Sequence, residues 1–243
     1  MKTICSLLFC FLTIASGAQD EEVWKPASKE SEAYHEYRIK PTVPPYGLAK
    51  VRTLIAKIEA DEEDSEALKP AVYSTLTLRE KFTYHMIHAE SYSQNCDAMP
   101  PIQDEHKKIF AYIPDAFGEY NWSNRQIDFF LNNRDSVAAF MSESISRTKR
   151  AGINFKHAII EMNAKQMIPL LIQTYKLTKK DYDILTVLMQ LMKDNKYEPF
   201  LKSASYKKLY SDDSDYQSFL QYNKGNEDLI IRRATDFYNA SKK

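Results

Sequence analysis

Residues 178–192, TKKDYDILTVLMQLM, are the part of the sequence that says most about the fold. Thr178 and Asp181 stand three residues apart, which is the spacing of a capping pair at the start of a helix. The residues that follow are apolar on nearly every side of such a helix: Tyr182, Ile184, Leu185, Val187, Leu188, Met189, Leu191 and Met192. Because a helix of this kind is buried by neighbours on several sides, we expect it at the centre of a helical core.

The same succession of cap, apolar stripe and short break recurs along the sequence and predicts further helices, one of them over 102–113. Other capping boxes are Thr77 with Glu80, Ser123 with Gln126 and Ser214 with Gln217. The 5 glycines are too few for many tight β-turns. The predicted fold class is therefore all-α, an irregular multi-helix bundle of about nine or ten helices in a single domain over 46–243.

Residues 155–210 are similar to stacked helical-repeat proteins of the HEAT kind. Paired helices recur there, with Pro169 and Pro199 near helix starts, where proline is well tolerated. No fixed period runs through the whole chain, so we prefer an irregular bundle and keep a solenoid as the alternative.

Residues 1–18, MKTICSLLFCFLTIASGA, have the three parts of a secretory signal peptide. Lys2 supplies the positive end, an apolar run follows, and Ser16 and Ala18 are small residues of the kind that signal peptidase prefers. The run is shorter than the ~20 residues that cross a bilayer, so we expect cleavage after Ala18 and no transmembrane segment in the mature chain. The sequence thus predicts export to the periplasm or the extracellular space.

Residues 19–45 are expected to be an extended linker. They show no sustained apolar period and contain several prolines among charged residues: Pro26, Pro41, Pro44 and Pro45. Proline fixes its own backbone angle and lacks an N–H donor, which favours extended chain.

Charge and cysteine content narrow the class of function. Removal of the leader takes one of the 33 basic residues, which leaves 32 against 33 acidic ones. Such a chain lacks the surplus of Lys and Arg that nucleic-acid binding requires, so we expect no nucleic-acid partner. Of the 3 cysteines only Cys96 would remain, which excludes an intrachain disulfide and suits a bacterial envelope protein.

His85 and His88 are candidate metal ligands. On a helix they lie about 60° apart, close enough to share an ion. Zinc would need one or two further ligands, for which Cys96 and His106 are candidates. The simpler interpretation is that His85 is a half-buried core residue, so no cofactor is expected and zinc is the alternative.

Residues 114–125, PDAFGEYNWSNR, gather polar and aromatic side chains between two predicted helices. Asp115 and Glu119 could act as acid and base in hydrolysis, which needs two carboxyl groups across the scissile bond. The candidate ligand-binding residues are Tyr120, Trp122 and Arg125, because aromatic rings with a polar handle suit stacking on a sugar. The alternative is that Phe117 and Trp122 fill the core while Glu119 and Arg125 pair at the surface.

The sequence contains no Gly-x-Ser-x-Gly elbow, P-loop or dinucleotide fingerprint. We therefore expect a non-enzymatic binding or interaction protein of the bacterial cell envelope, with an unknown protein or carbohydrate as its partner. The alternative is a hydrolase acting on an envelope or extracellular polymer, with either a metal at His85 and His88 or the carboxylates Asp115 and Glu119.

Overall fold

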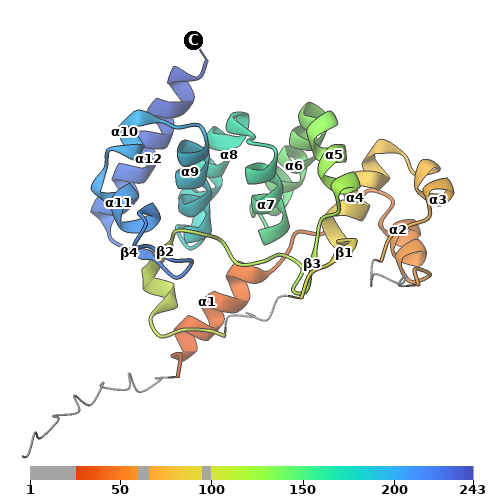
Figure 1. Cartoon of the computed structure of the whole chain (residues 1–243), viewed down its shortest axis with the longest axis horizontal. Helices are drawn as coiled ribbons and strands as arrows, with labels where there is room; N and C mark the ends of the chain where they lie inside the picture. The colour runs from red at the N-terminus through yellow and green to blue at the C-terminus, as the bar shows by residue number, and fades with distance from the viewer. Residues whose placement is uncertain (1–25, 60–65, 95–99, 243) are drawn as a thin grey trace, which may run out of the picture.

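The computed structural model describes residues 26–59, 66–94 and 100–242, and all structural statements refer to these ranges. Within them the chain forms twelve α-helices, two 3₁₀ helices and four short strands (Figure 1). The prediction of a mainly helical protein is confirmed, and the strands show that a strictly all-α class is wrong. The predicted signal peptide and Cys96 lie outside the described residues. None of the helices in these ranges has the length and apolar composition needed to cross a bilayer.

In chain order the elements are α1 (Lys29–Ile39), α2 (Leu48–Ile55), α3 (Pro70–Ser74), α4 (Leu78–Ile87), β1 (Ser91–Tyr92), η1 (Glu105–Lys107), β2 (Lys108–Phe110), β3 (Tyr120–Asn121), α5 (Asn124–Asn132), α6 (Arg134–Thr148), α7 (Ile153–Glu161), η2 (Lys165–Met167), α8 (Ile168–Thr178), α9 (Tyr182–Asp194), α10 (Glu198–Leu201), α11 (Ala204–Tyr210), β4 (Phe219–Gln221) and α12 (Lys224–Ala240).

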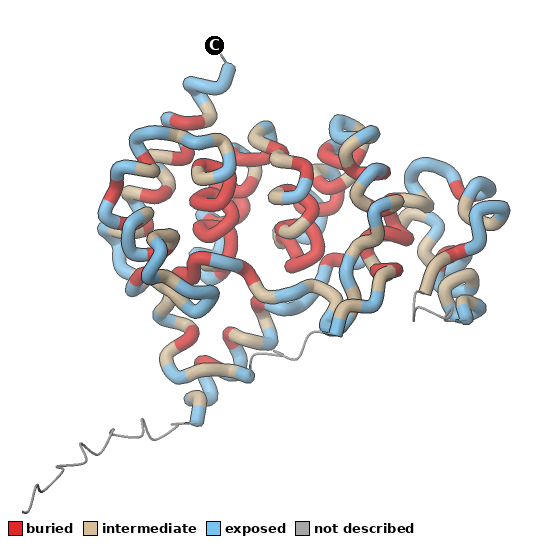
Figure 2. Tube along the Cα trace, in the orientation of Figure 1, coloured by how far each residue is buried: buried red, intermediate tan, exposed pale blue. Residues whose placement is uncertain are grey.

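Helix α9 is the centre of the main core, as the sequence predicted. All ten residues from Asp183 to Met192 are buried. Neighbours contact α9 on several sides, namely α7, α8, α10, α12 and β2. Figure 2 shows the buried residues concentrated on α9 and the helices beside it. A regular HEAT-like repeat in this region is not tested by these contacts and stays a prediction.

The described residues also form two small antiparallel sheets, and one of them stands where helices were expected. Strand β2 pairs with β4, so that Lys108 faces Gln221, and β1 pairs with β3. The predicted helix over 102–113 is therefore wrong, because half of it is η1 and β2. The helix predicted from Ser214 is also wrong: the Ser214 hydroxyl caps a turn by accepting from the Ser211 N–H at 3.1 Å, and β4 follows.

The expectation of an extended linker over 19–45 is wrong for Lys29–Ile39, which form α1. The Ser28 hydroxyl accepts from the N–H of Ser31 and caps the helix. Tyr34 and Arg38 are buried, and their four-residue spacing places both on the face that packs on the rest of the protein. The helix ends just before Pro41, so the prolines limit its length without keeping the whole segment extended.

Candidate ligand-binding pocket

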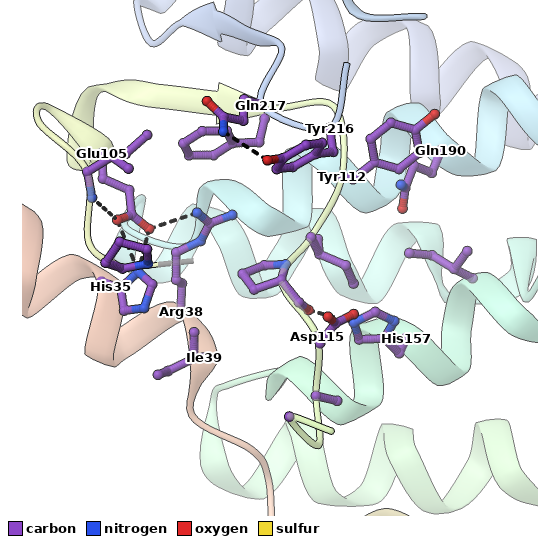
Figure 3. Close-up of a pocket in the computed structure, with 18 of the residues that line it drawn as sticks. His35, Arg38, Ile39, Glu105, Tyr112, Asp115, His157, Gln190, Tyr216 and Gln217 are labelled. Atoms are coloured by element: carbon purple, nitrogen blue, oxygen red, sulfur yellow. Dashed lines mark hydrogen bonds and ion pairs between the residues drawn. The ribbon is translucent and has the colours of Figure 1, made fainter. Parts of the chain in front are cut away.

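A pocket of about 930 Å³ opens between α1, the segment 100–119, the helices α7 and α9, and residues 216–217 (Figure 3). Its walls thus come from five parts of the chain that are far apart in the sequence. The three features that define its chemistry are a buried ion network behind α1, an apolar rim and a buried amide from α9.

Arg38 links α1 to the inner wall of the pocket through ion pairs. Its Nε and Nη2 donate to the two carboxylate oxygens of Asp183 at 3.2 and 2.7 Å, and its Nη1 donates to Glu105 at 2.8 Å. The guanidinium carbon lies 4.5 Å from the centre of the Phe110 ring, a cation–π contact. His35, one turn earlier on α1, places its Nδ1 3.0 Å from the Glu105 carboxylate. All three nitrogens of the Arg38 guanidinium therefore have carboxylate partners within the protein.

The ion network continues behind the pocket through Lys156 of α7. Its Nζ lies 2.5 Å from Asp181 and 3.7 Å from Asp183, and all three side chains are buried. Burial would raise the pKa of Asp183, but the charges of Arg38 and Lys156 lower it below its ordinary value. Burial raises the pKa of Asp181 despite the opposing charge of Lys156. Because each buried cation here faces carboxylates, the network positions α1 and α7 relative to α9.

His157 of α7 holds the start of the loop that carries Asp115. Its Nε2–H donates to the Pro114 carbonyl at 2.7 Å (Figure 3). Burial lowers the pKa of His157, and the Pro114 bond and the Asp115 charge only partly oppose it, so the imidazole is neutral at pH 7. The contact fixes the direction in which residues 114–119 leave the core.

Apolar side chains are exposed around the mouth of the pocket. Among the described residues, seven large hydrophobic side chains are exposed, and three of them line this pocket. They are Ile39, Tyr112 and Tyr216, which are 38%, 41% and 55% exposed. Clustering of exposed apolar side chains around a concavity is typical of a binding site.

Gln190 brings a buried polar group to the pocket from α9. The residue is only 6% exposed, and its Oε1 has no hydrogen-bond partner among the described residues. A buried amide carbonyl without a partner is uncommon in folded proteins. It therefore marks a place where a hydrogen-bond donor from a ligand would be accommodated.

The candidate catalytic residues and the candidate ligand-binding residues are separated. Asp115 and Glu119 both line the pocket, whereas Tyr120, Trp122 and Arg125 do not. The last three instead contact the region around α4 and the segment before it. Tyr120 donates from its hydroxyl to Glu66 at 3.0 Å, and the Trp122 Nε1–H donates to the His85 carbonyl at 2.8 Å. Arg125 pairs with Glu90 rather than with Glu119, and it also donates to the Leu68 carbonyl at 3.0 Å.

Trp122 is half-buried and packs against the main core. Its ring centroid lies 4.6 Å from that of Phe130 and 5.6 Å from that of Phe117, in edge-to-face arrangements in both cases. These contacts agree with the alternative interpretation for Trp122, which packs against the core, whereas Phe117 is half-buried and not part of that core. The Trp122 ring is therefore not available to stack on a ligand in the pocket.

His85 is fully buried and both of its ring nitrogens have hydrogen-bond partners. The Oε1 of Gln126 accepts from the N–H groups of Glu90 and Ser123, so its Nε2 is the donor to His85 Nδ1 at 2.9 Å. The imidazole is therefore neutral, with its proton on Nε2, 2.9 Å from the Tyr73 hydroxyl. Burial, together with the charge of Arg125, lowers the pKa of His85 well below its ordinary value.

His88 donates from Nε2 to the Glu66 carbonyl and does not line the pocket. Within the described ranges, no three His, Cys, Asp or Glu side chains are grouped closely enough to hold a metal ion. Cys96, one of the further ligands considered for zinc, lies outside those ranges. Zinc at His85 and His88 stays a prediction that this geometry does not favour.

The sequence did not predict that α1 and α9 would line the site. Arg38 and His35 fall in the stretch expected to be extended, and Gln190 was treated as part of a buried helix. A signal for α1 was present, since acidic residues occupy its first turn and Arg38 its last, the charge distribution that stabilises a helix dipole.

The chain was compared with family models, with curated proteins and with solved structures. No family model matches it, and no curated protein or solved structure matches it at a significant level. Its function is therefore inferred from the residues and the geometry of the pocket.

Proposed function

We propose that this chain is an exported, non-enzymatic binding protein of the bacterial cell envelope, which holds a ligand or a short part of a partner in the pocket beside α1. The observation that carries the proposal is the pocket itself. Its volume of about 930 Å³ falls within the range of about 300–1,000 Å³ that is usual for ligand sites. The exposed apolar rim and the unpartnered Gln190 amide support the same conclusion, and the composition of residues 1–18 supports export.

Native mass spectrometry of the purified protein, after incubation with the low-molecular-weight fraction of an envelope extract, tests this proposal. The expected result is an added mass that survives gel filtration. The double variant Tyr112→Ala/Tyr216→Ala should lose it, because both exposed rings belong to the rim. Leu177→Ala is the matched control, since it removes an exposed apolar side chain outside this pocket. Absence of an added mass, or its persistence in the double variant, would contradict the proposal.

A hydrolase acting on an envelope or extracellular polymer is the second candidate, and one observation favours it. Asp115 and Glu119 line the same pocket, and two carboxyl groups facing one bond are the usual acid and base of glycoside hydrolysis. Release of reducing ends from envelope polysaccharides by the protein, abolished in Glu119→Gln, would support this activity. Absence of turnover, or turnover unchanged in Glu119→Gln, would exclude it.

A further inference from the structure

The lining of the pocket is negatively charged. Arg38 is the only Lys or Arg among the described residues that line it, whereas Glu105, Asp115 and Glu119 all contribute carboxylates. Arg38 already pairs with Glu105 and, behind the lining, with Asp183. With histidines counted as neutral, a ligand entering the pocket therefore meets a negative potential.

The strongest hydrogen-bond donors of the lining are already engaged within the protein. The guanidinium of Arg38 donates to Asp183 and Glu105, and His157 Nε2 donates to the Pro114 carbonyl. Gln217 Nε2 donates to the Tyr216 hydroxyl at 3.2 Å. The contrasting feature is an acceptor, the Oε1 of Gln190, which has no partner among the described residues. A complementary ligand therefore brings donors and positive charge.

The exposed side chains at the rim of the pocket indicate what the uncharged part of the ligand should be. Tyr112 and Tyr216 expose aromatic rings beside the exposed aliphatic side chain of Ile39. These side chains can cover an apolar or aromatic body, and the face of a tyrosine ring also attracts a cation. The lining thus favours a positively charged end of the ligand, and the rim favours an apolar or aromatic end of the same molecule.

We propose that the pocket binds an organic amine, that is, a protonated amino group carried on an apolar or aromatic body. The inference rests on the proposed binding function and narrows its ligand class. The amino group donates to Gln190 Oε1 in the field of Asp115 and Glu119, while the body lies against the rim. A phosphate or carboxylate ligand would meet like charge in the same place, which disfavours its binding.

Three probes of matched shape and different charge test this inference by isothermal titration calorimetry: 2-phenylethylamine, 2-phenylethanol and 3-phenylpropanoate. The amine should bind most tightly, and at low salt its Kd should be below that of the propanoate by on the order of tenfold or more. The difference should shrink at about 1 M salt, where the Debye length is about 3 Å.

Two substitutions localise the effect. Glu119→Gln should reduce the preference for the amine without changing the affinity for the alcohol, because it removes one charge from an exposed position. Gln190→Leu should weaken the amine more than the alcohol, with an unchanged melting temperature as the check on folding. Asp236→Asn, on the exposed face of α12 and outside the pocket, is the control and should leave all three affinities unchanged.

Equal affinities for the three probes, tighter binding of the propanoate, or no measurable binding of the amine would each overturn the inference. None of these results affects the proposed binding function, which depends on the ligand captured from the envelope extract. Conversely, absence of a captured ligand would contradict that function whatever the amine does.

Discussion

Arg38 of α1 and Asp183 of α9 form a two-point ion pair although 145 residues separate them, with N–O distances of 3.2 and 2.7 Å. Both side chains are buried. The pair joins the first helix of the described chain to its most buried helix. Because α1 forms one wall of the pocket, the shape of the pocket depends on this contact.

Arg38→Ala should destabilise the protein by about 3–5 kcal/mol, because it leaves Asp183 and Glu105 buried with less compensating positive charge. Urea unfolding of the variant measures this loss. Lys202→Ala is the control, since Lys202 pairs with Glu198 at the exposed surface and its removal should change stability little. Similar unfolding curves for the two variants would show that the buried pair does not hold α1 in place.

Gly152→Ala should destabilise the protein where the chain after α1 meets α7. The Gly152 N–H donates to the Thr42 hydroxyl at 2.8 Å, and an added Cβ would lie 2.1 Å from the Thr42 backbone nitrogen. Relief of that clash requires a backbone shift, so we expect a loss of about 1–3 kcal/mol in urea unfolding. Gly225→Ala is the control, because its nearest contact is a side-chain oxygen of Asn223 at 3.2 Å. Equal stability of the two variants would rule out close packing at Gly152.

Acidification should lower the free energy of unfolding as the pH falls below about 6.5. Burial lowers the pKa of both His85 and His157 from the ordinary value of 6.5. The unfolded chain therefore binds more protons than the folded protein between 6.5 and the folded pKa values. The stabilisation from neutral imidazoles is complete above pH 6.5 and is lost as the pH falls through that window.

His157→Gln should reduce this pH dependence, because glutamine can still donate to the Pro114 carbonyl but does not titrate. Urea unfolding of the wild type and the variant at pH 7.5 and 5.5 gives the comparison. A fall in stability on acidification that is as large in the variant as in the wild type would mean that His157 is not responsible.

Trp122→Ala should reduce stability and leave ligand binding in the pocket unchanged. The ring packs on Phe130 and its N–H donates to the His85 carbonyl, but the residue is only partly buried. The loss should therefore be smaller than the about 3–5 kcal/mol typical of a fully buried aromatic residue. If the Trp122→Ala variant lost the captured ligand without losing stability, Trp122 would be a binding residue after all.

The elements that were predicted correctly depend on local signals. The capping boxes of Thr77 with Glu80 and of Ser123 with Gln126 are both present, and each begins a helix. Helix α9 was also predicted correctly as a buried helix, because its burial follows from its own apolar composition. Within the candidate site, Asp115 and Glu119 belong to one loop, so the sequence could associate them with each other.

The features that were missed depend on partners far along the chain. Lys108 pairs with Gln221 across the β2–β4 sheet, and neither segment has a strand pattern strong enough to be recognised alone. Arg38 is buried only because Asp183 and Glu105 neutralise it, and no local pattern shows that. The pocket exists where such long-range contacts bring segments together, which is why only its loop could be predicted.

Hydrogen–deuterium exchange, measured with and without saturating 2-phenylethylamine, tests most directly whether the pocket beside α1 binds an organic amine. The account predicts slower exchange in the segments 35–39, 112–119 and 216–217, which contribute side chains to the lining of that pocket. Slower exchange confined to residues 168–177 and 235–239, the segments around a second cavity between α8 and α12, would contradict it, as would no change anywhere.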